Sequence, residues 1–380
     1  MTNSKFILFI RANLFQITFI LLSAGLSILL AGIIDIENPD YSHMDFNKYR
    51  SMSLASPGIS DNIIQPFAYR FLMPWLAGLF SSNVDTSFVW LNLIGLLALV
   101  LLLYYYLIKE GAEKDVSAVI VISFIFNRYF FKMLAWIPYQ LADTYSLLII
   151  IFLLLLLKNK KWLLISFLLM VGIAVKETVL IIIPVAYLYC FQNGKDYKSI
   201  LHFTVASFPA VIIFVLLRVS VHTAESESFF EQFITGIPLF VSPELIIKKL
   251  FLAFTPLGFV PFLFFTSLKD FTVKHAHLVL LFILVFISSV MGNFERVMLP
   301  AAPAFCLFAS LAISKELNVV KSKTRTYILL LIILSSVLSS FYHLYGIILL
   351  PNKDISLISA VVFNLAVLIV IKSRLIIEHG

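Results

Sequence analysis

The chain contains repeated apolar runs of about the length that crosses the hydrocarbon core of a bilayer, roughly 20 residues for a helix. One run, residues 147–157, is continuously apolar, whereas a strand of a membrane β-barrel would alternate over about 10 positions. Hydrophobic residues make up 61% of the 380 and charged residues 13%, against roughly 25% charged in a soluble domain. The pattern predicts an all-α polytopic membrane protein that forms one integral-membrane domain over residues 1–380.

We expect roughly 12 transmembrane or re-entrant helices. A single crossing over 162–191 would leave Lys176 and Glu177 at the bilayer centre, where a charge costs a few kcal/mol. That stretch is therefore expected to be a short hairpin with both residues at its turn. The expected spans are 12–34, 86–108, 116–131, 142–157, 162–175, 178–191, 200–217, 251–267, 277–291, 298–313, 327–347 and 355–371.

Lys and Arg residues concentrate in alternate short loops, such as the one that holds Lys158, Lys160 and Lys161. By the positive-inside rule these loops are cytoplasmic. This predicts cytoplasmic termini and a location in the bacterial inner (plasma) membrane. The net charge of +7 then reflects the membrane, and no nucleic acid is expected as a partner. The same orientation predicts two long loops on the outer face, a first outer (periplasmic) loop, 35–85, and a second long outer loop, 218–250.

The first outer loop contains several acids close to the membrane surface. Asp45 and Tyr49 are spaced i, i+4 and share one face if this piece is helical. A carboxylate here, Asp45 or Asp40, is a candidate general base, although acids in an outer loop are also ordinary solvated residues. His43 and Asp45 supply only two metal ligands, so no metal site is assigned, and a divalent cofactor is left open.

The segment 66–74 mixes aromatic residues with a single cation, Arg70. Aromatic residues such as Tyr69 populate membrane interfaces, so we expect this segment to lie along the surface or to re-enter it. Arg70 then has two roles open to it. Its guanidinium either binds a lipid phosphate bidentately or anchors the segment by reaching to water.

Three further outer positions carry charges with two interpretations each. Lys176 with Glu177, and Glu295 with Arg296, form either structural ion pairs or a cation that faces a substrate phosphate. Asp143 begins an apolar helix, where the helix dipole favours an acid, so capping explains it without a substrate. The sequence has no P-loop, dinucleotide fingerprint, GxSxG or HExxH motif.

The order of a first helix, an Asp-rich outer loop and then residues 68–77 resembles the GT-C superfamily of integral-membrane glycosyltransferases. The likeness is nearest to glycolipid mannosyltransferases and their bacterial relatives. Residues 69–76 are similar to a Tyr-Arg-Tyr-x-Pro-Leu-Leu segment of some members, and 175–178 and 294–300 are similar to turns of the bacterial relatives. Eukaryotic members often show Asp-x-Asp-Tyr, where this chain reads Asn38-Pro39-Asp40-Tyr41, without the first Asp.

The resemblance implies an inverting glycosyltransferase that moves a hexose from a polyprenyl-phosphate donor to an envelope glycan or lipid acceptor on the outer face. Asp45, or else Asp40, would be the catalytic base, and the long first outer loop would form part of the active site. Arg70 and Lys176 are the first candidates for the cation on the leaving phosphate. The implied partners are membrane lipid, the donor and the acceptor, and the implied substrate-binding residues are Tyr49, Tyr69, Arg70, Lys176, Glu177, Arg296 and Asp143.

Two other classes of protein fit the same composition. A transporter or flippase of a lipid-linked glycan would use the same basic groups to hold a phosphate without chemistry, and it predicts polar groups that reach both faces. A scaffold subunit of an envelope-assembly complex would depend on whole loops rather than on single acids.

Overall fold

The computed structural model describes residues 3–35, 37, 45–58, 63–64, 66–80, 83–192, 197–221, 250, 253–289, 295–318, 320–341 and 362–373. Over these ranges the chain is helical and contains no strand. Six helices in the described ranges are long and apolar enough to cross a membrane, or eight if each of two bent pairs is one span. This confirms an all-helical polytopic membrane protein, and the larger number of roughly 12 crossings stays a prediction.

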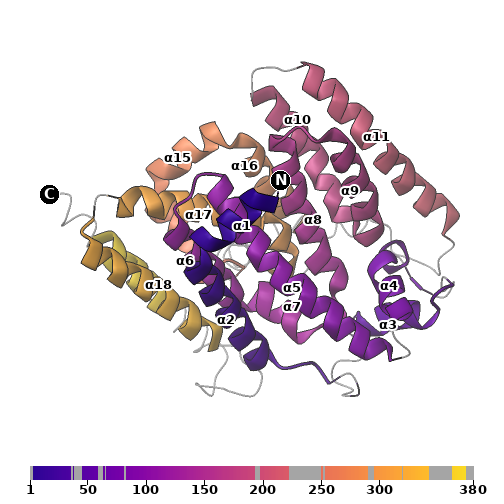
Figure 1. Ribbon diagram of the computed structural model, residues 1–380, viewed down its shortest axis with the longest axis horizontal. Helices are drawn as coiled ribbons and strands as arrows, with labels where there is room; N and C mark the ends of the chain where they lie inside the picture. The colour runs from indigo at the N-terminus through magenta and orange to yellow at the C-terminus, as the bar shows by residue number, and fades with distance from the viewer. Residues whose placement is uncertain are drawn as a thin grey trace.

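The helices carry the labels of Figure 1, with η for short 3-10 or π segments. In chain order they are α1 (Asn3–Ala12), α2 (Leu14–Ala31), α3 (Phe46–Leu54), η2 (Phe67–Tyr69), α4 (Leu72–Phe80), α5 (Val84–Lys109), α6 (Lys114–Phe126), η3 (Arg128–Lys132), α7 (Met133–Trp136), α8 (Leu141–Lys158), α9 (Trp162–Val175), η4 (Glu177–Ile181), α10 (Ile182–Gln192), α11 (Tyr197–Ser220), η7 (Leu257–Phe259), α14 (Val260–Leu263), α15 (Phe265–Lys274), α16 (Ala276–Ser288), η9 (Glu295–Ala301), α17 (Ala302–Leu317), α18 (Ser322–Phe341) and Val362–Ser373.

Burial separates central helices from rim helices. The apolar stretch of α8 is 78% buried and that of η9 with α17 is 89% buried, whereas α2, α11 and α18 are between 22% and 28% buried. In Figure 1 the ribbons of α8 and α17 lie inside those of α11 and α18. The rim exposes large apolar side chains, among them Phe15 and Leu29, which a soluble protein would not leave to water. These surfaces contact membrane lipid.

Hydrogen bonds between apolar helices tie the bundle together. Ser27 of α2 donates to the Ile125 carbonyl of α6 at 3.0 Å, and Ser336 of α18 donates to Ser123 of α6 at 2.8 Å. Asn92 of α5 donates to the carbonyl of Leu134 at 2.8 Å. Such side-chain bonds stabilise helix pairs where both helices and the lipid are equally apolar.

The predicted spans agree closely with some helices and poorly with others. The span 116–131 is not one straight helix, because α6 ends at Phe126 and the segment from Arg128 is bent from it by 49°. The span 162–175 coincides with α9, and the expected hairpin is present as α9, a break at Lys176 and then η4 with α10. The span 251–267 is not one helix, because its described part consists of η7, α14 and the start of α15. Pro256, which directly precedes η7, lacks the N–H that would continue a helix through it.

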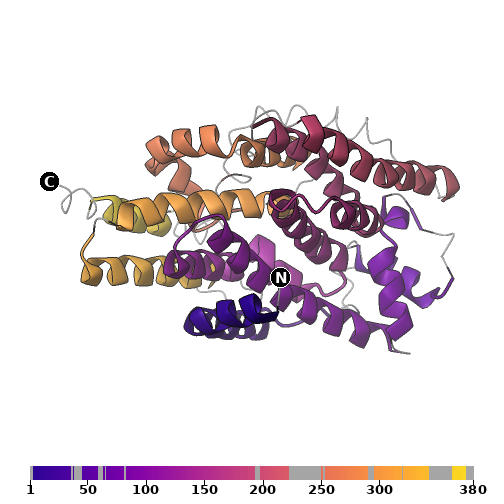
Figure 2. The ribbon, with the colours of Figure 1, turned by 45° about the horizontal axis from the view of Figure 1, so that its top comes forward.

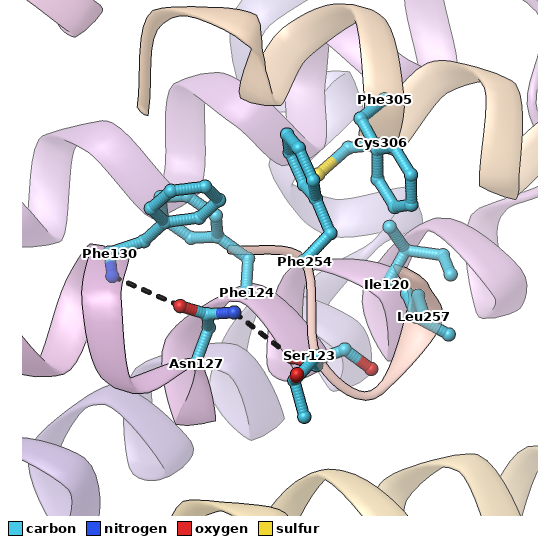
Figure 3. Close-up of a pocket in the computed structure, with 10 residues that line it drawn as sticks. Ile120, Ser123, Phe124, Asn127, Phe130, Phe254, Leu257, Phe305 and Cys306 are labelled. Carbon is cyan, nitrogen blue, oxygen red and sulfur yellow. Dashed lines mark hydrogen bonds between the residues drawn. The ribbon is translucent and has the colours of Figure 1, made fainter. Parts of the chain in front are cut away.

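Asn127 joins the end of α6 to the π-helical turn η3. Its Oδ1 accepts hydrogen bonds from the backbone N–H groups of Tyr129 and Phe130 at 2.9 and 3.0 Å, and its Nδ2 donates to the carbonyls of Ala253 and Thr255. The small pocket beside it (Figure 3) measures about 20 Å³, room for one water molecule. Four of its ten lining residues are Phe, and no residue of the charged cluster described below lines the pocket.

The short helices α3 and α4 pack against each other beside the main bundle, far from α18 in both views (Figures 1 and 2). Their backbones approach closely at Gly78, where a Cβ atom would lie 2.1 Å from the Ser53 carbonyl oxygen. The Ser53 hydroxyl also donates to the Pro74 carbonyl at 2.6 Å. This packing fixes the described parts of the segment 35–85 relative to one another.

Candidate functional site

A charged cluster lies where α3, the η2–α4 segment, α8, the α9–η4 break and η9 come together. We use the name charged cluster for these residues throughout. Its members are Asp45, Lys48, Arg70, Asp143, Lys176, Glu177 and Arg296. Six of the seven are residues that the sequence singled out, and they come from positions as distant as 45 and 296.

Lys176 and Asp143 form the most buried pair of the charged cluster. Their ammonium and carboxylate groups are hydrogen-bonded, and the Asp143 side chain is only 8% exposed. Asp143 stands in the first turn of α8, where the helix dipole also favours it. Lys176 directly follows α9 with an extended backbone, and its side chain reaches Asp143 from this break. Asp143 therefore acts as an ion-pair partner and not only as a capping group.

Arg70 and Glu177 form a second, two-pronged pair. The Arg70 Nε atom donates to Glu177 Oε2 at 3.0 Å, and its Nη2 atom donates to Oε1. Lys176 and Glu177 are thus neighbours that pair with other residues, not with each other. The pair joins the segment between η2 and α4 to the turn of the α9–α10 hairpin.

Tyr49 lies beneath this pair on α3. It is fully enclosed, and its ring meets Phe67 edge-on at 5.5 Å. The guanidinium of Arg70 hydrogen-bonds its phenol oxygen. Burial raises the pKa of Tyr49 to about 12, because the phenolate would lose its hydration there. The helical geometry of α3 also places Asp45 one turn before Tyr49, as the i, i+4 spacing predicted.

Arg296 bridges the two aspartates. Its Nη2 atom lies 3.8 Å from Asp45 Oδ2, and its Nε atom lies 3.7 Å from Asp143 Oδ2. Lys48 donates to the other oxygen of Asp45 at 3.3 Å. The Asp45 side chain is 28% exposed, against 8% for Asp143, so Asp45 is the aspartate of this pair that an incoming molecule can reach.

Tyr69 lies at the edge of the charged cluster and takes part through its ring. The guanidinium of Arg218, near the end of α11, stacks over the rings of Tyr69 at 4.7 Å and of Phe214 at 3.6 Å. Arg218 also lies close enough to Glu177 to interact with its charge. Such cation–π contacts hold a guanidinium without using a carboxylate.

The charged cluster occupies one end of the helices. Asp143 begins α8, while Lys158 at the opposite end of α8 pairs with Glu110 at 3.1 Å. Arg296 lies in η9 ahead of α17, while Lys315 near the end of α17 pairs with Asp270. The segments that the sequence assigned to one face of the membrane therefore meet at one end of the bundle.

Some predicted positions lie outside the described residues. These are Asp40 and His43 of the first outer loop and most of the second outer loop, residues 222–249. Among the described residues, no group of three or more His, Cys, Asp or Glu side chains is placed to hold a metal ion.

Two members of the site were not predicted from the sequence. Lys48 stands three positions after Asp45 on the same helix, a spacing that would have indicated the pair. Arg218 ends an apolar helix, where a basic residue has the ordinary explanation of the helix dipole and the interface. Only the folded arrangement brings it over Tyr69.

Comparison with models of protein families finds none that matches the chain. Comparisons with curated proteins and with solved structures find no match either. The fold and the charged cluster define an all-helical integral membrane protein. Its acidic and basic side chains form a compact group at one end of the helices.

Proposed function

We propose that the protein is a GT-C-type glycosyltransferase that moves a sugar from a polyprenyl-phosphate donor to an envelope glycan or lipid acceptor. The observation that supports the proposal is the convergence of Asp45, Arg70, Lys176, Glu177, Asp143 and Arg296 into one charged cluster. A carboxylate that accepts a proton and cations that stabilise a leaving phosphate are the two groups this transfer needs.

In the proposed reaction the acceptor oxygen attacks the anomeric carbon of the donor and inverts it. The bond between that carbon and the phosphate oxygen breaks, and its electron pair stays with the phosphate. The acceptor proton moves to Asp45, the more exposed aspartate, with Asp40 as the alternative base. The transition state has oxocarbenium character, as in glycoside hydrolysis, and needs no general acid, because a phosphate is a good leaving group.

The contacts favour Arg296 as the cation that receives the phosphate. Arg70 and Lys176, the first candidates from the sequence, are hydrogen-bonded to Glu177 and Asp143. Arg296 is held more loosely, at 3.7 and 3.8 Å from its carboxylates. Arg70 and Lys176 then orient the acids and add positive charge nearby. The apolar rim of the bundle provides the lipid contact that a polyprenyl tail requires.

The proposal is tested by sugar transfer with the purified protein, a polyprenyl-phosphate-linked hexose and a lipid acceptor. Removing the general base by Asp45→Asn is expected to lower the rate by about 10²- to 10⁴-fold. Full activity in both Asp45→Asn and Asp40→Asn would contradict the assignment of either aspartate as the general base. Movement of a labelled lipid-linked glycan across vesicle membranes, without any glycosylated product, would indicate that the protein is a flippase and not a transferase.

The proposed location is the bacterial inner membrane, with the charged cluster on the outer face and both termini in the cytoplasm. Single cysteines test this orientation at two exposed positions, Ser51 of α3 and Asn159 after α8. We expect a membrane-impermeant maleimide to label Ser51→Cys in intact cells and Asn159→Cys only after permeabilisation. The native Cys190 and Cys306 are buried and give a low background. The reverse labelling pattern would invert the topology.

A further inference from the structure

Arg296 differs from the other cations of the charged cluster in how it is held. Lys48, Arg70 and Lys176 each donate a hydrogen bond to one carboxylate. The distances from Arg296 to Asp45 and Asp143 are 3.8 and 3.7 Å, beyond the usual hydrogen-bond range. Within the described part of the chain, Arg296 is therefore shared by two acids and hydrogen-bonded to neither.

The two acids do not depend on Arg296 alone. Asp45 keeps Lys48 at 3.3 Å, and Asp143 keeps Lys176. Arg296 can thus turn to another anion without leaving either carboxylate unpaired. A phosphate presents oxygens that fit the guanidinium fork and accept two parallel hydrogen bonds, which is better geometry than Arg296 has with either aspartate.

We propose that an incoming phosphate group displaces Asp45 from Arg296, so that occupation of Arg296 by the anion and release of Asp45 are one event. The proposal rests on the proposed function in taking the donor phosphate as the natural anion. Before the donor binds, Asp45 is held between Lys48 and Arg296. After it binds, Asp45 retains Lys48 alone and is free to approach an acceptor hydroxyl. Arg296 then binds the donor phosphate and at the same time makes release of the base depend on donor binding.

The exchange can be detected by measurements of anion affinity alone, because the competition between Asp45 and the anion for Arg296 is reciprocal. If the anion must compete with Asp45 for Arg296, removal of the Asp45 charge must tighten anion binding. Simple repulsion between Asp45 and the anion would also tighten binding on its removal. The two causes differ in their dependence on Arg296, because only the exchange requires that residue.

The experiment measures the affinity of the purified protein in detergent for farnesyl phosphate and for inorganic phosphate by calorimetry. We expect Asp45→Asn to bind either anion about fivefold more tightly, the factor that corresponds to one weak ion pair. In the Arg296→Gln background the same substitution is expected to give no gain. Asp85→Asn is the matched control, because Asp85 pairs with Arg50 outside the charged cluster, and it is expected to leave both affinities unchanged.

Each possible outcome either supports the exchange or contradicts part of the proposal. An unchanged or weaker affinity in Asp45→Asn overturns the exchange, and a gain that persists with Arg296→Gln replaces it with simple repulsion. Equal gains for both anions assign the exchange to the phosphate group, whereas a gain for farnesyl phosphate only assigns it to the lipid-linked form. Sugar transfer is measured separately: its absence beside an intact Arg296-dependent gain overturns the transferase and leaves the exchange standing. Melting temperatures of all variants identify any that has not folded.

Discussion

Lys176 and Asp143 are hydrogen-bonded across 33 positions of sequence, from the end of α9 to the first turn of α8. The Asp143 side chain is 8% exposed and that of Lys176 is 16% exposed. The pair is thus the point at which the turn of the α9–α10 hairpin is attached to the centre of the bundle.

Loss of the Lys176 charge is expected to destabilise the protein strongly. Lys176→Met leaves the buried Asp143 carboxylate without its hydrogen-bonded cation, which costs about 3–5 kcal/mol. The double variant Lys176→Met with Asp143→Leu is expected to be more stable than Lys176→Met, because it buries no unpaired charge. The free energies of unfolding in mixed micelles check both values. Lys315→Met is the control, since its pair with Asp270 is exposed and is worth at most about 1 kcal/mol.

The packing of α3 on α4 is expected to tolerate no side chain at Gly78. A Cβ atom there lies 2.1 Å from the Ser53 carbonyl oxygen, which is backbone and cannot rotate away. Gly78→Ala is therefore expected to cost about 1–3 kcal/mol, as overpacking does, and to lower the proposed transfer activity by displacing α3 and Tyr49. Gly25→Ala in α2 is the control, because nothing lies within 4 Å of its Cβ position. Equal stability of the two variants would contradict the close approach.

The buried phenol of Tyr49 predicts a loss of stability in alkali. Its pKa is about 12 in the folded protein and about 10 when unfolded. A raised pKa means that the contribution is fully present below pH 10 and is lost as the pH rises through 12, by about 1.4 kcal/mol per pH unit between them. We expect Tyr49→Phe to flatten the fall of the melting temperature between pH 10 and 12. An unchanged slope in this variant would place the titrating group elsewhere.

The fork geometry of Arg70 is expected to matter more than its charge. Arg70→Lys keeps a cation but loses the two-pronged contact with Glu177 and the contact with Tyr49. A lost hydrogen bond of this kind costs about 1–3 kcal/mol when its partner stays buried. The measurement is the free energy of unfolding, with Arg50→Lys as the control in a more exposed two-pronged pair with Asp85. Equal losses in the two variants would show that burial is irrelevant to the Arg70 contact.

The sequence predicts the membrane class and the identity of most cluster residues for a simple reason. In so apolar a chain, each charge near a helix end needs a partner, so Lys176, Asp143 and Arg296 were conspicuous. The hairpin at Lys176 was predicted for a related reason, because a charged side chain at the bilayer centre is unfavourable. The membrane class and the hairpin can be predicted from the periodicity and composition of short segments, without knowledge of any tertiary contact.

The partners themselves were not predictable. Nothing local indicates that Glu177 pairs with Arg70 and not with the adjacent Lys176, because the choice depends on how the hairpin packs against the first outer loop. The broken region after Thr255 was expected to be one helix, since hydropathy averages over Pro256 and Pro261. Arg218 was missed because its partners are aromatic rings rather than acids.

The wide spacing of the cluster along the chain has a consequence for biogenesis. A ribosome must synthesise about three quarters of the 380 residues before Arg296 emerges to join Asp45 and Asp143. Until then Asp45 and Asp143 have only their lysine partners, so a chain that ends before η9 lacks the cation that links the two acids.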